Sequence, residues 1–241
     1  MVVLLVVATI IMFVLVDLAI QSYEAKKQGK LVYAGEKNAF VAEEIQLAGS
    51  TRAIRGFSEN SYRIPMGVFF HKGHTWANIL ISGYVKVGID DFVQRSLGRI
   101  DEVDLPPIGR EVKQGEKVFS IKQGNRKAVF QSPIDGVVCS VNHMLLDQPD
   151  AIKKDPYTYG WLCAIKPSNL SENIRSMKVA KEAALWLKSE VQRFKETMMA
   201  RSLGLCPDFA TIQDGGEIID GLLEYLDNES WATFEKNFLK S

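Results

Sequence analysis

A series of short β-prone segments begins at Pro65, and it limits the possible folds more than any other feature of the chain. Gly67, Gly73 and Gly83 separate the first of these segments. Short strands at even spacing, with turn residues between them, are typical of small closed or sandwiched β-structures. We therefore predict a mainly β domain. Its expected strands are residues 68–70, 75–81, 84–89, 100–105, 111–112 and 136–141.

One short helix is expected between these strands, over residues 90–98. Asp90 stands at its start, apolar residues follow at helical spacing, and Gly98 stands at its end. An acidic residue at the first position and a glycine after the last turn are common helix boundaries. The β domain should therefore contain at least one helical insertion.

Residues 115–136 contain the pattern of a β-hairpin. Two β-prone runs, 118–122 and 127–130, flank a turn signal over residues 123–126. If Gly124 and Asn125 form a two-residue turn, Lys122 and Lys127 stand opposite each other one pair below the tip. A hairpin displays the residues at its tip, so we look there first for chemistry.

After Pro167 the pattern changes from strand to helix. A single long helix is expected over residues 171–201, ended by Gly204 and Pro207, because apolar residues recur there every three to four positions. A helical pair, 217–226 and 230–239, follows. Packing on the chain's own β domain is the ordinary outcome for such a tail. Docking to a partner protein, with Trp231, Phe234 and Phe238 in contact, is the alternative.

The N-terminus has the composition of a membrane span. Residues 1–16 are apolar apart from Thr9, and the apolar run continues to Ile20 with Asp17 as its only charge. Roughly 20 residues of helix rise about 30 Å, which matches the hydrocarbon core of a bilayer. No basic segment precedes the run and no convincing cleavage site follows it, so a retained anchor is favoured over a signal peptide.

The charges beside this run predict its orientation. Lys26, Lys27 and Lys30 follow it and no basic residue precedes it. Positive residues flank membrane helices on the cytoplasmic side. We therefore predict a single-pass protein of the cytoplasmic membrane with the bulk of the chain in the cytoplasm.

Charge and cysteine content exclude several classes of function. The 29 basic and 29 acidic residues cancel, which gives no electrostatic case for binding nucleic acid. The three cysteines, Cys139, Cys163 and Cys206, are odd in number and widely spaced, which fits neither a disulfide framework nor a zinc site. Cys139 and Cys163 lie in apolar strands, so we expect them in the core.

No catalytic or metal-binding set stands out in the sequence. His71 and His74 have a spacing that could serve a metal ion, but no third ligand lies nearby. A structural role is therefore expected for both. We find no arrangement of serine, histidine and aspartate, no phosphate-binding glycine loop and no carboxylate pair, so we predict that the protein is not an enzyme.

The order of short motifs resembles the glycine cleavage system H protein. The motifs of the first half are His74-Thr75-Trp76, Val87-Gly88-Ile89-Asp90-Asp91-Phe92, Leu97-Gly98, Asp104-Leu105-Pro106-Pro107-Ile108-Gly109 and Gly115. Those of the second half are Asn142, Pro149, Asp155-Pro156-Tyr157, Gly160-Trp161-Leu162 and Ile165-Lys166-Pro167. The similarity covers about residues 65–169.

The resemblance implies a barrel-sandwich hybrid that carries lipoate on a lysine at its hairpin tip, within the segment Glu-Ser-Val-Lys-Ala. Counting forward from Gly115 or back from Pro133 places that lysine position at Asn125. The glutamate and serine of the family segment fall on Lys122 and Gln123. An asparagine amide has no nucleophilic amine, so we predict no lipoyl group and no other cofactor. Lys127 and Lys122 are the fallback attachment sites.

The expected organisation has four parts. They are a transmembrane anchor at 1–22, a connector at 23–64, the H-protein-like barrel-sandwich domain at 65–169 and a helical C-terminal extension at 170–241. The leading hypothesis is a non-lipoylated structural or docking subunit of a membrane-associated complex, such as a redox or respiratory one. In it, the basic residues Lys122, Arg126 and Lys127 contact an acidic partner protein.

Two other hypotheses remain open at this point. One is a membrane-tethered lipoyl carrier modified on Lys127 or Lys122. The other is an adaptor of the periplasmic membrane-fusion type, which requires the opposite topology and long coiled hairpins beside the barrel. The sequence shows neither of those two features.

Overall fold

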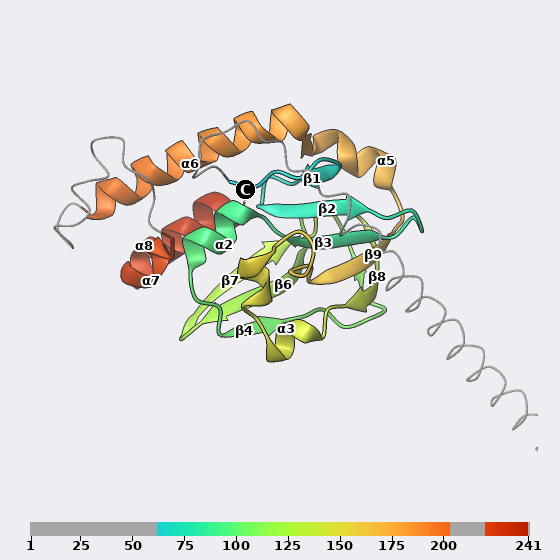
Figure 1. The fold of residues 1–241 in the computed structure, drawn as a ribbon, viewed down its shortest axis with the longest axis horizontal. Coiled ribbons are helices and arrows are strands. Elements are labelled where there is room, and N and C mark those ends of the chain that lie inside the picture. Colours follow the sequence, from blue (N-terminus) through green and yellow to red (C-terminus); the bar gives the residue numbers. More distant parts are fainter. Residues whose placement is uncertain (1–61, 203–219, 241) are drawn as a thin grey trace, which may run out of the picture. The chain divides into compact units, whose positions relative to one another are not determined.

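The computed structural model describes residues 62–202 and 220–240 (Figure 1). The predicted anchor at 1–22, most of the predicted connector and Cys206 lie outside the described residues. Within the two described ranges, no helix is both long and apolar enough to cross a membrane.

Two antiparallel sheets form the body of the protein. The larger sheet has seven strands in the order β10-β1-β2-β3-β9-β8-β5, and the smaller has three in the order β4-β6-β7. The strands are β1 (Val68–Phe70), β2 (Thr75–Ile79), β3 (Val85–Ile89), β4 (Glu102–Asp104), β5 (Glu111–Val112), β6 (Lys117–Gln123), β7 (Arg126–Gln131), β8 (Gly136–Val141), β9 (Cys163–Pro167) and β10 (Lys178–Val179). The predicted mainly β domain is confirmed.

The predicted helix between β3 and β4 is present as α2 (Asp91–Leu97). The Asp90 side chain accepts a hydrogen bond from the Val93 backbone N–H at 2.9 Å, which caps the first turn. Gly98 ends the helix with a φ of 75°, a conformation that favours glycine. Two single-turn helices, α3 (Met144–Asp147) and α4 (Ala151–Lys154), lie between β8 and β9.

The hairpin is confirmed at the predicted register. Gln123 pairs with Arg126 and Lys122 pairs with Lys127, which leaves Gly124 and Asn125 as a two-residue turn. Gly124 adopts a φ of 55°, as the first residue of such a turn requires. Asn125 therefore lies at the tip.

The predicted single helix over residues 171–201 is wrong in its first part. The chain forms α5 (Leu170–Asn173), a 3-10 turn η1 (Ile174–Ser176) and the strand β10 before α6 (Ala180–Ser202) begins. Val179 of β10 pairs with Phe69 at the edge of β1. This strand pairing holds the backbone extended where the apolar spacing alone favoured helix.

The C-terminal segment consists of α7 (Leu222–Tyr225), α8 (Asn228–Phe234) and a π-helical turn η3 (Glu235–Leu239). The predicted helix over 230–239 is thus present, but it begins two residues earlier and changes to π geometry at Glu235. Asp227 caps α8 by accepting a hydrogen bond from the Ser230 backbone N–H at 2.8 Å. The predicted helix over 217–226 lies within the described residues only from residue 220 onward. In that part, Leu222–Tyr225 form helix α7.

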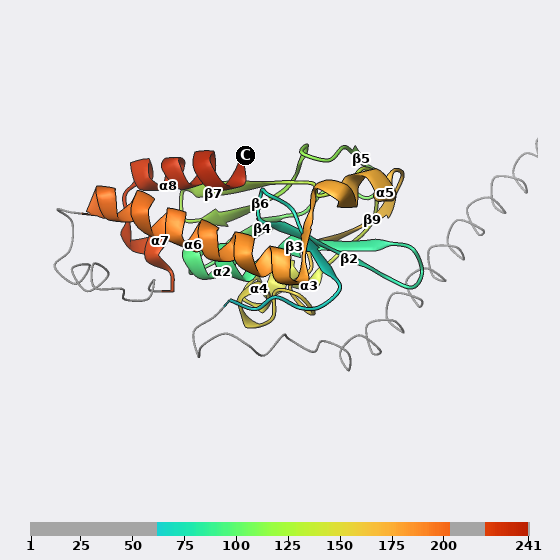
Figure 2. The ribbon, with the colours of Figure 1, turned by 90° about the horizontal axis from the view of Figure 1, so that it is seen from above.

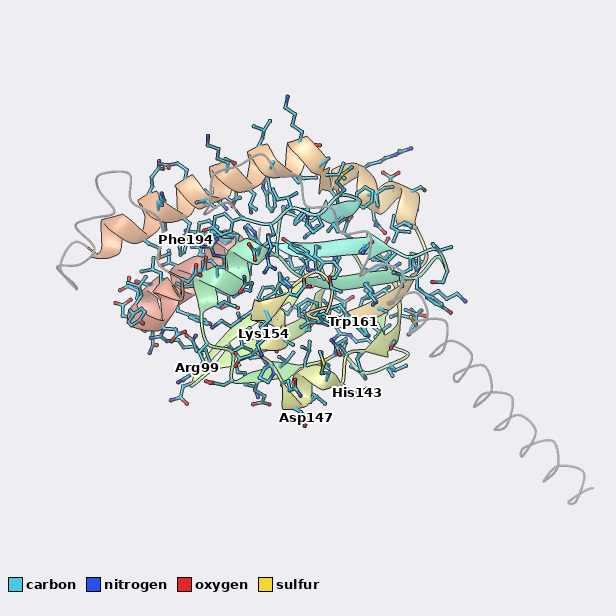
Figure 3. All side chains as sticks on the ribbon, viewed as in Figure 1. Arg99, His143, Asp147, Lys154, Trp161 and Phe194 are labelled. Atoms are coloured by element: carbon cyan, nitrogen blue, oxygen red, sulfur yellow. The ribbon has the colours of Figure 1, made fainter. Side chains whose placement is uncertain are left out.

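One apolar core joins the sheets to the C-terminal helices. Buried side chains from β3, α2, β7, α6, α8 and η3 belong to the same cluster. Phe194, labelled in Figure 3, extends from α6 and contacts Phe234 and Phe238, with ring centroids 5.6 and 5.7 Å away. Because these rings are removed from water, the helices of the predicted extension and the β domain are stabilised together.

Candidate functional site

The tip of the β6–β7 hairpin is the candidate site. Gly124 and Asn125 are exposed, and the Gly124 N–H donates to Asp101 Oδ2 at 2.6 Å. The structure therefore places Asn125 where the sequence predicted it, at the apex of a hairpin with a fixed turn.

Gln123 fastens the hairpin to the end of α2. Its side chain is 7% exposed, and its Nε2 donates to the carbonyl oxygens of Leu97 at 2.6 Å and Arg99 at 2.7 Å. The last carbonyls of a helix have no partner within the helix, so this amide satisfies one of them. The position that aligns with the family's recognition serine is thus used for a structural contact.

Lys122 and Lys127 form ion pairs on the hairpin flank. Lys122 Nζ lies 2.9 Å from Glu102 Oε1, and Lys127 Nζ lies 2.8 Å from Asp104 Oδ2. The hydrogen bond to Glu102 raises the pKa of Lys122, and the one from Lys127 lowers the pKa of Asp104. Two cations face two carboxylates, so this flank carries no excess positive charge.

Arg126 is directed toward the chain's own C-terminal segment. Its guanidinium donates to the carbonyl oxygens of Leu223 and Leu226, each at 2.7 Å, and to Asn228 Oδ1 at 2.9 Å. The same group lies 5.6 Å from the centroid of the Trp231 ring. Lys122 and Lys127 are thus paired with carboxylates and Arg126 is bound to the C-terminal segment, so contact of these three cations with an acidic partner stays a prediction.

The three aromatic residues proposed for partner docking are buried. Trp231 is 5% exposed, and Phe234 and Phe238 are fully buried. Their rings therefore offer no surface to a second protein. They pack against the chain's own β domain, the first of the two outcomes considered for the tail. The spacing of these residues could indicate only an apolar face, because it carries no information on what covers that face.

A polar cavity of about 410 Å³ opens beside the tip. It lies between the hairpin and the C-terminal segment and is lined by Arg99, Gln123, Gly124, Asn125, Arg126, Glu224 and Asn228. Asn125 therefore borders this open cavity on one side.

A buried ionic group lies under α6, away from the tip. His74 Nδ1 is 2.7 Å from Asp90 Oδ2, its Nε2 is 3.5 Å from Glu190 Oε2, and its ring stacks on Trp186. Burial lowers the pKa of His74, but Asp90 and Glu190 raise it by more, to about 9. Sequence reasoning missed Glu190 because α6 joins His74 only through the tertiary fold.

The other histidine and the cysteines have structural environments. His71 Nδ1 accepts a hydrogen bond from the Gly73 N–H at 3.1 Å, and burial lowers its pKa to about 4. In residues 62–202 and 220–240, no group of three side chains is arranged to hold a metal ion. Cys163 is buried as predicted, but Cys139 sits at a strand irregularity and is only half-buried.

Comparisons with known proteins give the family. The model of the glycine cleavage H-protein family matches residues 68–190. A probable glycine cleavage system H protein of Pyrococcus abyssi is 39% identical over 128 residues, which are 53% of this chain and 95% of the relative. Glycine cleavage system H protein 4 of Aquifex aeolicus is 34% identical over 143 residues, which are 59% of this chain and 82% of the relative.

A solved structure is similar as well. It is a glycine cleavage system H protein from Mycobacterium marinum, with 28% sequence identity and a TM-score of 0.47, and the match covers 52% of this chain and 99% of that chain. The resemblance inferred from short motifs is confirmed by the family model and the relatives. This chain belongs to the glycine cleavage H-protein family.

Proposed function

We propose that this protein is a non-lipoylated, membrane-anchored member of the H-protein family that serves as a structural or docking subunit of a membrane-associated complex. H proteins are normally lipoyl carriers. The observation that carries the proposal is Asn125 at the apex of the β6–β7 hairpin, where the family attaches lipoate. A carboxamide cannot form the lipoyl amide bond, which requires a nucleophilic amine.

The neighbouring lysines do not replace the missing amine. Lys122 and Lys127 pair with each other one step below the turn, on the strands rather than at the apex. Each ammonium group also contacts a carboxylate, Glu102 or Asp104. A shift of the hairpin by one residue would turn its buried face outward, so the register resists any movement that would bring a lysine to the tip.

The mass of the native protein tests this proposal. We expect the intact mass of protein purified from its own cells to equal that of the unmodified chain, and a lipoate-directed blot to give no signal. Lipoylated enzymes in the same extract serve as the positive control for the blot. A lipoyl adduct mapped to Lys122 or Lys127 would contradict the proposal.

That adduct would support the second candidate function, a membrane-tethered lipoyl carrier. Family membership is the observation that favours it, since the relatives are named as H proteins of the glycine cleavage system. Replacing Lys127 or Lys122 singly with arginine keeps the ion pairs and removes the primary amine. Loss of the blot signal in one variant would then identify the modified lysine.

Membrane attachment is part of the proposal and rests on the apolar run at residues 1–20. We expect the full chain to remain in the membrane fraction after a high-salt wash and a chain lacking residues 1–22 to appear in the soluble fraction. Release of the full chain by salt would contradict a membrane-spanning anchor. Crosslinking the full chain in native membranes before purification would then identify the partner subunits.

The docking surface of this proposal does not include the hairpin cations. Lys122 and Lys127 already face carboxylates, and Arg126 is bound to the C-terminal segment. A partner would have to break these contacts before using the charges. Crosslinks between this chain and its partners should therefore map mainly away from the β6–β7 turn.

A further inference from the structure

We propose that the C-terminal segment, residues 220–239, is a built-in cap that restricts the access of other macromolecules to the hairpin tip while leaving the tip open to small solutes. Figures 1 and 2 both show α7 and α8 beside α2 and the β6–β7 hairpin. This inference goes beyond the proposed function, because it concerns access to Asn125 and holds whether or not any lysine carries lipoate.

The first contact of the cap is made by Arg126. Helix α7 has only four residues, so its carbonyl groups have few partners within the helix. Arg126 donates one N–H to Leu223 O and another to Leu226 O, both at the C-terminal end of α7. A cation is favourable there because it satisfies the free carbonyls and the negative end of the helix dipole.

The guanidinium also fixes the start of α8. Its Nε donates to Asn228 Oδ1 at 2.9 Å, and its Cζ lies over the Trp231 ring, 5.6 Å from the ring centroid. A single side chain from the hairpin therefore holds the junction of α7 and α8. A lysine could not reproduce this geometry, because it lacks the planar fork that directs donors to several acceptors at once.

A second set of contacts holds the cap against the end of α2. The Gly221 N–H donates to Arg95 O at 2.6 Å, and Arg95 Nε lies 2.7 Å from Asp220 Oδ1. A Cβ atom on Gly98 would lie 2.6 Å from the Gly221 Cα, so the two glycines allow a close approach of the backbones. The Glu224 side chain accepts a hydrogen bond from the Arg99 backbone N–H.

The cap is also anchored in the core, so it is a fixed part of the fold. Phe234 and Phe238 are fully buried, and η3 packs against β7. Asn125 itself remains exposed, on the edge of the cavity of about 410 Å³ that separates it from Glu224 and Asn228. The C-terminal segment lies on one side of the tip, so we expect a protein surface that approaches from that side to meet α7 and α8 before it reaches Asn125.

Cysteine labelling in two sizes tests the cap. The background is the full-length chain in detergent with Cys139→Ser and Cys206→Ser. In it, the labelling rate of Asn125→Cys is compared with that of Lys117→Cys, an exposed position at the other end of β6. Each is treated with a small maleimide and with a maleimide on a bulky polymer. We expect similar rates with the small reagent, but a rate about tenfold slower at position 125 with the bulky one, because that reaction requires local opening of the tail.

Removing the Arg126 contacts provides the second arm. In the Asn125→Cys chain, Arg126→Ala should bring the rate with the bulky reagent toward that at position 117, and Arg126→Lys should restore only part of the protection. Where Arg126→Ala does not fold, Asn228→Ala is used in its place, because it removes one of the acceptors of the Arg126 side chain. In the chain that keeps Arg126, the ratio of the bulky-reagent rate to the small-reagent rate is compared between positions 125 and 117, and equal ratios would overturn the cap. If the bulky-reagent rate at position 125 did not change when Arg126 was removed, the role of Arg126 in holding the cap would be overturned.

Discussion

Replacement of Phe234 with alanine is expected to lower the free energy of unfolding by about 3–5 kcal/mol, the usual cost of truncating a buried phenylalanine. The side chain is fully buried and lies among three other phenylalanine rings. Its centroid is 5.4 Å from that of Phe238, 5.6 Å from Phe194 and 6.4 Å from Phe92. Alanine would leave a cavity between α2, α6 and the C-terminal segment that the β-sheets cannot close.

Denaturant unfolding of the purified chain checks this value, and Tyr225→Ala is the matched control. Tyr225 is an aromatic residue of the same segment, but it is 71% exposed, so its loss should change the stability by no more than about 0.5 kcal/mol. If the two variants were equally stable, the C-terminal segment would not share the core of the β domain. The proposed cap would then lose its anchor as well.

Local signals in the sequence account for the parts of the fold that could be predicted. Asp90 and Gly98 bound α2 because an N-terminal acceptor and a residue with positive φ act within one turn of the chain. The hairpin was predicted from Gly124 in the same way, and counting from Gly115 on one side and Pro133 on the other placed Asn125 at its tip. These features need no knowledge of what the rest of the chain does.

Contacts between distant segments account for what could not be predicted. The strand at Lys178 and Val179 exists because β1 offers an unpaired edge, which no local pattern reveals. Arg126 was expected to face a partner because its acceptors, Leu223 and Leu226, are backbone carbonyls and leave no mark in the sequence. Likewise, the apolar spacing of the tail identified side chains that must be buried but did not identify the surface that buries them.

The buried pair of His74 and Asp90 leads to the second prediction with a large effect, a loss of stability at alkaline pH. The pKa of His74 in the folded protein is raised to about 9 from an ordinary value of 6.5. Between these values the folded state binds a proton that the unfolded state releases, so stability falls as pH rises. The contribution is complete below pH 6.5 and is lost by pH 9, which at about 1.4 kcal/mol for each pH unit amounts to about 3–4 kcal/mol.

Within the described residues, two carboxylates, those of Asp90 and Glu190, face the imidazole of His74. Asp90 contacts it from the start of α2, and Glu190 faces it from α6 and is itself paired with Arg193. The interaction with His74 opposes burial and lowers the pKa of Glu190. Deprotonation of His74 would therefore leave two carboxylates facing an uncharged ring and would weaken the attachment of α6 to the β domain.

Asp90→Asn separates this pair from other alkaline effects. The asparagine oxygen can still cap α2, but the charge that holds His74 protonated is gone, so we expect a loss of about 3–5 kcal/mol at pH 6 and a flatter profile between pH 6.5 and 9. His143→Gln, at an exposed histidine, should keep the slope of the unaltered protein. Unfolding free energies measured across this range decide the matter, because equal slopes for Asp90→Asn and the unaltered chain would show that His74 is not charged in the folded state.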